Sequence, residues 1–127
     1  MDAIAKNQFK SRLYQYNLSL LKFLSKQPLD VITNEIKKQL IRCGTSTGAN
    51  YFEALAASSK RDFINFFHHS LKSINESKFW LGIIRDIRPT DVLVLNYLIK
   101  ETEEIGNILA ASILTMKGKR KGIHKQI

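Results

Sequence analysis

Several kinds of residue and segment are scarce in this sequence of 127 residues, and each absence excludes a class of protein. The single cysteine, Cys43, has no partner for an internal disulfide, which fits a reducing compartment. No apolar run approaches the roughly 20 residues that a membrane span requires, and the first residues lack the apolar stretch of a secretory signal. We therefore expect a cytoplasmic protein without a membrane partner, folded around one core that needs no disulfide.

Motifs that carry known chemistry are also missing. There is no GxGxxG fingerprint, and the string Gly44–Gly48 is too short for a phosphate-binding loop and lacks the lysine that would follow. His68 and His69 are adjacent, so on a helix their imidazoles diverge by about 100° and do not meet at one metal ion. Cys43 lies on an apolar stripe, where a cysteine usually serves as a small hydrophobic residue. We expect no cofactor, no metal site and no enzymatic activity.

Proline and glycine are few, and both prolines stand between long helical patterns. Apolar residues recur at spacings of three and four over four stretches, without sustained period-two alternation. We predict helices over Ala5–Ser25, from a cap at Asp30 to Ala54, over Lys60–Asp86, and from Thr90 to Lys117. Short loops favour an antiparallel up-down-up-down four-helix bundle over residues 1–117, followed by a basic flexible tail over residues 118–127.

The apolar stripes also predict which side chains form the core and which remain at the surface. The inward stripes are Phe9, Leu13, Tyr16, Leu20 and Leu24; Ile32, Ile36, Leu40, Cys43 and Thr47; Phe63, Phe67, Leu71, Ile74, Leu81 and Ile84; and Val92, Leu95, Leu98, Thr102, Ile105, Leu109 and Ile113. Further apolar residues lie off these stripes, namely Ile41, Tyr51, Phe52, Leu55, Phe66, Phe79 and Trp80. A second apolar face on a helix is typical of packing on a neighbouring subunit, so we expect self-association.

Two glycines inside the second predicted helix mark a close contact. Gly44 and Gly48 are four residues apart and are surrounded by small side chains. A glycine in a helix interior costs about 0.5–1 kcal/mol relative to alanine, a cost that close approach of another backbone would offset. We predict a tight helix–helix contact here, with Asn50 and Glu53 as the polar groups beside it.

Glu53 and Glu76 are the carboxylates that fall nearest the predicted core, and Glu76 lies one turn before Trp80. A carboxylate pair in a helical bundle would suit a metal pair, but di-metal bundles use Glu-x-x-His motifs that this chain lacks. The alternative is a buried polar cluster in which the Asn50 amide donates to a carboxylate and fixes the helix register. We favour the structural cluster over a catalytic or metal-binding role for Glu53, Glu76 and Asn50.

Acidic residues are scarce relative to basic ones: 11 Asp and Glu against 20 Lys and Arg, for a net charge of +9. Residues 117–127 carry five of the basic residues and no acid, which leaves a net charge of +4 on residues 1–116. Such a basic segment attracts polyanions through counterion release, although it also suits a solubilising end. Candidate phosphate-binding residues are Arg12, Lys37, Lys38, Arg42, Lys60, Arg61, Lys117, Lys119, Arg120, Lys121 and Lys125.

Three blocks of the sequence resemble the bacterial four helix bundle protein family, whose founding members are encoded in intervening sequences of 23S ribosomal RNA genes. The blocks are residues 39–54, 62–66 and 72–81, and the matching positions are Arg42, Ser46, Ala49, Asn50, Glu53, Asp62, Phe63, Ile64, Glu76, Trp80 and Leu81. Cys43 and Gly44 depart from the family's usual Ser-Ala pair. The resemblance implies a four-helix protomer that assembles as a ring-shaped homopentamer, and it brings no catalytic residues.

The resemblance also implies a relation to the accessory variability determinant of diversity-generating retroelements, a basic pentamer that partners a reverse transcriptase and binds nucleic acid. Two functions follow as expectations. The first is a non-enzymatic homo-oligomer that binds RNA or DNA through phosphate contacts, with low sequence specificity. The second is an accessory scaffold that binds a reverse transcriptase.

Overall fold

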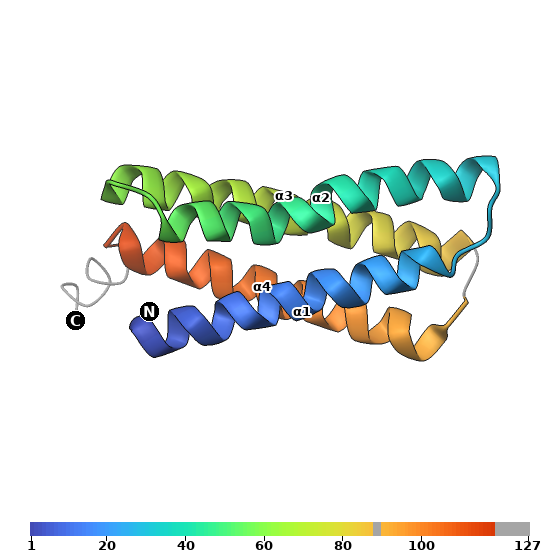
Figure 1. Cartoon of the computed structure of the whole chain (residues 1–127), viewed down its shortest axis with the longest axis horizontal. Coiled ribbons are helices and arrows are strands. Elements are labelled where there is room, and N and C mark those ends of the chain that lie inside the picture. Colours follow the sequence, from blue (N-terminus) through green and yellow to red (C-terminus); the bar gives the residue numbers. More distant parts are fainter. Residues whose placement is uncertain (88–89, 119–127) are drawn as a thin grey trace, which may run out of the picture.

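The protein is described here by a computed structural model that covers residues 1–87 and 90–118 and consists of four α-helices. The helices are α1 (Ala3–Ser25), α2 (Val31–Leu55), α3 (Lys60–Ile87) and α4 (Val92–Met116). They lie side by side along the long axis, and the start of α1 and the end of α4 are at the same end of the molecule (Figure 1). Neither of the two described ranges contains a strand, so the prediction of an all-α four-helix protein is confirmed.

Side chains at the start of the first three helices bind the free backbone N–H groups. Asp2 accepts a hydrogen bond from the backbone N–H of Ala5 at 2.8 Å, and Asp30 accepts one from that of Thr33 at 2.9 Å. Ser59 Oγ accepts from the backbone N–H of Asp62 at 3.1 Å. These are the contacts expected of N-cap residues, each of which stabilises a helix by about 1 kcal/mol. The predicted caps at Asp30 and Ser59 are confirmed.

The start of α4 differs from the prediction. Helix α4 begins at Val92 and not at Thr90, whose hydroxyl donates to Gln27 Oε1 at 2.8 Å and so ties the α3–α4 connection to the α1–α2 connection. Asp91 stands at the N-cap position with a left-handed backbone (φ 49°) and makes no capping hydrogen bond with its side chain. The start of α4 is thus held by a contact between two loops, which a local sequence pattern does not predict.

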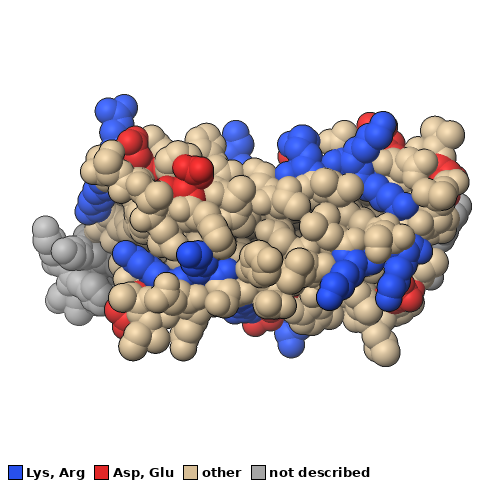
Figure 2. All heavy atoms as spheres, in the orientation of Figure 1, with Lys and Arg blue, Asp and Glu red and all other residues tan. Residues whose placement is uncertain are grey.

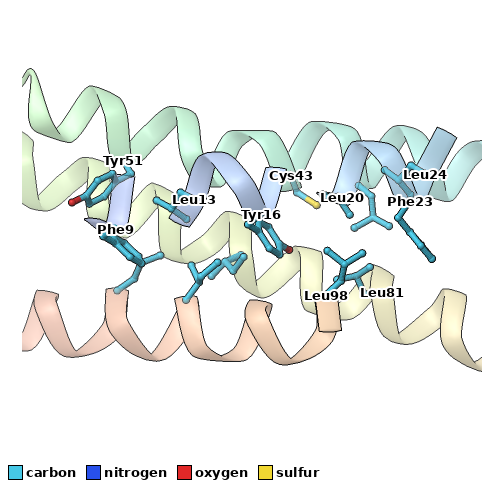
Figure 3. Packing of buried hydrophobic residues seen from close by; sticks show 14 of the residues in the cluster. Phe9, Leu13, Tyr16, Leu20, Phe23, Leu24, Cys43, Tyr51, Leu81 and Leu98 are labelled. Atoms are coloured by element: carbon cyan, nitrogen blue, oxygen red, sulfur yellow. The ribbon is translucent and has the colours of Figure 1, made fainter. Parts of the chain in front are cut away.

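The core runs along the centre of the bundle, where each helix contacts two others: α1 packs on α2 and α4, and α3 packs on α2 and α4. Most of the predicted inward residues are buried, among them Leu13, Leu20 and Leu98, which Figure 3 shows with their neighbours. Ile32 and Val92 are exceptions, at 61% and 51% exposed. Both lie in the first turn of a helix, at the end of the bundle, where no other helix covers them.

Tyr51 corrects the prediction of a second apolar face on α2. It is fully buried, with its ring edge-on to Phe9 at 4.9 Å between centroids, and its hydroxyl donates to the backbone oxygen of Lys6 at 3.2 Å. Of the other residues predicted to lie off the inward stripes, Leu55 of α2 and Phe66 and Trp80 of α3 are partly buried against the core. The residues that remain exposed are Ile41, Phe52 and Phe79.

The two glycines of α2 make the predicted tight contact with another helix, although it is side chains of α1 and not its backbone that reach them. A methyl group added at Gly44 would lie 2.2 Å from Leu20 Cδ2, and one added at Gly48 would lie 2.4 Å from Asn17 Oδ1. Asn17 Nδ2 donates to the backbone oxygen of Gly44 at 2.6 Å, so a side chain of α1 bonds directly to the backbone of α2. Only a residue without a side chain leaves room for this contact.

Buried hydroxyl groups fill the interior where the helices meet closely. Ser70 Oγ donates to the backbone oxygen of Thr47 at 2.7 Å, and Ser77 Oγ lies 3.2 Å from Cys43 Sγ. The Tyr16 hydroxyl lies 2.7 Å from Thr102 Oγ1 and donates to it, because the Thr102 hydroxyl donates to the backbone oxygen of Leu98. Within the described ranges every buried side-chain nitrogen and oxygen has a hydrogen-bond partner. None of the four helices is both long and apolar enough to cross a bilayer.

The glycine contact gives a first testable prediction. Gly44→Ala should lower the free energy of unfolding by about 1–3 kcal/mol, because the added methyl group overlaps the fully buried Leu20 side chain. The loss should appear even though alanine favours a helix by up to about 1 kcal/mol. Gly82→Ala is the matched control, since its nearest neighbour would be Arg85 at 3.9 Å, and it should leave stability unchanged or raise it. Chemical denaturation measures both, and equal effects would contradict the close contact.

Candidate nucleic-acid interface

Three of the predicted phosphate-binding residues lie at the end of the bundle that holds the α1 start and the α4 end. Lys60 and Arg61 are the first residues of α3, Lys117 follows the last residue of α4, and all three are exposed. Lys60 also lines an apolar pocket of about 790 Å³, together with Lys6, Phe63, Phe67 and Met116 among others. The predicted residues Lys119, Arg120, Lys121 and Lys125 lie outside the described residues.

Arg12 joins α1 to α4. Its Nε and Nη2 donate to the two carboxylate oxygens of Glu101, at 3.0 and 2.5 Å, and Nη2 lies 3.6 Å from Glu104. The bond to Glu101 raises the pKa of Arg12. A phosphate would have to displace these carboxylates to reach the guanidinium, so this arginine acts first as a link between two helices.

The three predicted cations of α2 have different surroundings. Lys37 Nζ donates to the backbone oxygen of Gln27 at 3.0 Å, and Lys38 is exposed. Arg42 forms an ion pair with Glu76 of α3 and also donates to Gln39 Oε1 at 3.1 Å. Lys38 is thus the cation of this group whose charge is most accessible to a polyanion.

Basic side chains are spread along the molecule. Figure 2 shows one face of it, on which Lys and Arg occur over the whole length, interrupted by Asp and Glu, with no single compact basic patch. Such a distribution suits many weak phosphate contacts better than one specific pocket.

A polar groove of about 520 Å³ lies between α2 and α3. Its α2 side is formed by residues four apart on one face of the helix, and its α3 side by residues three or four apart. The groove is lined by Arg42, Ser46, Asn50, Phe66, His69, Lys72, Ser73 and Glu76.

Hydrogen bonds across this groove connect the two helices. Ser73 Oγ donates to Ser46 Oγ at 3.0 Å, and Asn50 Nδ2 lies 2.8 Å from both the backbone oxygen and the hydroxyl of Ser46. Glu76 accepts from Arg42 and, at 3.2 Å, from Trp80 Nε1. These hydrogen bonds connect the side chains at the base of the groove and hold the lining residues in place.

The predicted polar cluster is therefore present in part and differently composed. Asn50 donates to Ser46 and not to a carboxylate. Glu53 is exposed and does not line the groove. Gly44 and Gly48 face α1 instead.

Five lining residues were missed as site residues by the sequence analysis: Ser46, Phe66, His69, Lys72 and Ser73. The recurrence of polar or aromatic residues at positions 66, 69, 73 and 76 was a usable signal. This recurrence was not interpreted as a site, because Phe66 was assigned to an apolar face and His69 was considered only as a metal ligand.

The groove has an excess of positive charge. Arg42 and Glu76 neutralise each other, whereas Lys72 is exposed and forms no ion pair within the part of the chain that the structure describes. The His69 ring lies edge-on to Phe66, with 6.3 Å between ring centroids. In residues 1–87 and 90–118 no group of three or more His, Cys, Asp or Glu side chains is placed to hold a metal ion. Burial raises the pKa of the Cys43 thiol, which disfavours the reactive thiolate.

These features define a basic four-helix-bundle protein with a polar groove between α2 and α3. The chain belongs to the 23S rRNA-intervening sequence protein family, which matches residues 6–111. It is also similar to the crystal structure of a protein of unknown function from the S23 ribosomal protein family of Bacteroides thetaiotaomicron VPI-5482. That match has a TM-score of 0.71 and 26% identity, and covers 82% of this chain and 96% of the other. Among curated proteins, none matches the chain. The family resemblance predicted from the central blocks is confirmed.

The two arginine–glutamate pairs should contribute differently to stability. Arg12 and Glu101 form a bidentate pair in which the Glu101 side chain is only 12% exposed, whereas the Arg42 and Glu76 side chains are 60% and 37% exposed. A double-mutant cycle with Gln at both positions should give a coupling energy of about 1–2 kcal/mol for the first pair and about 0–0.5 kcal/mol for the second. Urea denaturation of the single and double variants measures both couplings. A larger value for Arg42 and Glu76 would overturn this ranking.

Proposed function

We propose that this protein is a non-enzymatic, basic helical bundle that binds RNA or DNA through phosphate contacts. The observation that carries the proposal is the net charge of +9, distributed as exposed cations along the molecule and concentrated beyond Met116. Phosphate contacts of this kind supply affinity whatever the base sequence. The binding residues in this proposal are the exposed cations Lys38, Lys60, Arg61 and Lys117, together with Lys119, Arg120, Lys121 and Lys125 of the C-terminal segment.

We further propose that the protomer is an up-down-up-down bundle that assembles with copies of itself, as a pentameric ring by family resemblance. The exposed apolar side chains Ile41, Phe52 and Phe79 support self-association, because they are large and lie on α2 and α3 away from the core. Assembly multiplies a weak basic patch, since several C-terminal segments bound to one nucleic acid share a high effective concentration.

The reverse-transcriptase scaffold stays a prediction from the resemblance. No contact or pocket among the described residues favours a polymerase partner over a nucleic acid.

The C-terminal cations give a prediction about salt. In the full-length chain, replacement of Lys117, Lys119, Arg120, Lys121 and Lys125 by Gln should weaken nucleic-acid binding and flatten its dependence on salt. Each lost phosphate contact should lower the slope of log K against log salt concentration by about 0.7–0.9. Fluorescence anisotropy with a labelled single strand, at several salt concentrations, measures the slope.

The matched control removes the same number of charges from exposed lysines elsewhere, namely Lys10, Lys22, Lys26, Lys78 and Lys100. It should reduce the slope less than the C-terminal variant does. Equal reductions would mean that binding depends on net charge alone, and an unchanged slope in the C-terminal variant would remove that segment from the interface.

A further inference from the structure

We propose that the α2–α3 groove binds one nucleotide unit of a single-stranded nucleic acid, with its phosphate at Lys72 and its base against Phe66. This inference rests on the proposed function, because it identifies a site for one nucleotide of a strand that the basic surface binds. The groove lies among the basic residues of α2 and α3 and is open to the surface. Its volume of about 520 Å³ is within the roughly 300–1,000 Å³ typical of small-molecule sites.

The charges of the groove fit one phosphodiester. Arg42 and Lys72 are positive, and Glu76 is the single acidic residue of the lining. Because Glu76 already accepts hydrogen bonds from Arg42 and from Trp80 Nε1, the Lys72 ammonium is left as the uncompensated charge. One phosphodiester carries one negative charge, so its arrival neutralises the groove.

The other lining residues fit a base. Phe66 is half-buried beside His69, so its ring is positioned by contacts with the protein while part of it remains accessible. Bases stack on such rings with little regard to sequence. Asn50 uses its Nδ2 group for Ser46, and its Oδ1 forms no hydrogen bond with any described residue, which leaves an acceptor for a base N–H.

Two other kinds of ligand fit less well. The lining holds a single carboxylate and a single histidine, too few to bind a metal ion firmly. An acidic peptide would satisfy Lys72, but it would leave Phe66 and the Asn50 acceptor unused. The combination of a cation, an aromatic ring and an amide within one groove is what recognises a nucleotide.

The single tryptophan of the chain makes the groove observable. Trp80 Nε1 donates to Glu76 Oε2 at 3.2 Å, and Glu76 lines the groove, so a nucleotide at this site perturbs the indole environment. The experiment titrates the full-length protein with the octanucleotides rU8 and dT8. It records Trp80 fluorescence, and it records anisotropy of the labelled strand at several salt concentrations.

Three variants of the groove and one control separate stacking, charge and packing. Phe66→Leu should raise Kd at least about fivefold at every salt concentration with the slope unchanged, whereas Phe66→Tyr, which keeps a stacking ring, should bind like the parent protein. Lys72→Gln should lower the salt slope by about 0.7. Lys78→Gln removes an exposed lysine of the same helix that lies 3.5 Å from Glu103, and it should change Kd less than twofold. Circular dichroism confirms that each variant is folded.

The outcomes distinguish this inference from the proposed function. Binding of rU8 or dT8 without a change in Trp80 fluorescence, or with Phe66→Leu equal to Phe66→Tyr, overturns the groove site and leaves the electrostatic binder standing. Failure of both strands to bind at low salt overturns both. A poly-Glu peptide that displaces the strands and changes Trp80 fluorescence to the same extent would show that the groove reads charge alone, and so would also overturn the nucleotide site.

Discussion

The contact of α1 side chains with two glycines of α2 is the constraint on which the rest of the bundle depends. At Gly44 and Gly48 the second helix has no side chain on the face toward α1, and Asn17 bonds to the Gly44 backbone oxygen at 2.6 Å. A hydrogen bond from a side chain to a helix carbonyl fixes both the spacing and the register of the two helices. Any larger residue at Gly44 would meet Leu20, which is itself fully buried.

The neighbouring face of α2, about 100° round the helix, is also lined by small residues, and it contacts α3. There Cys43 and Thr47 meet Ser77 and Ser70, whose hydroxyl groups bond to α2. With small residues used for both helix contacts, the longer polar side chains of α2 are left at the outer edge of its contact with α3. This is why Arg42 and Asn50 line a groove instead of entering the core.

Much of the fold followed from the sequence, because it rests on local periodicity and on short-range caps. The four helices, the caps at Asp30 and Ser59 and the glycine contact are of this kind. The contacts within the candidate site could be predicted from the sequence less completely than the fold. Whether Asn50 meets Glu76 of α3 depends on the rotation of α2 against α3, which one helix pattern does not determine. The same holds for Arg12, whose partner Glu101 is 89 residues away, and for Tyr51, whose burial depends on the position of Phe9 on another helix.

The position of the chain ends gives the molecule a polarity. The start of α1, the start of α3 and the end of α4 occupy one end of the bundle, and the α1–α2 and α3–α4 connections occupy the other (Figure 1). At the far end Leu29 and Leu93 are both more than four-fifths exposed, next to the two connections that the Gln27–Thr90 hydrogen bond joins. A helix of 25 residues is about 37 Å long. This apolar tip therefore lies about one helix length from Lys60, Arg61 and Lys117 at the opposite end of the bundle.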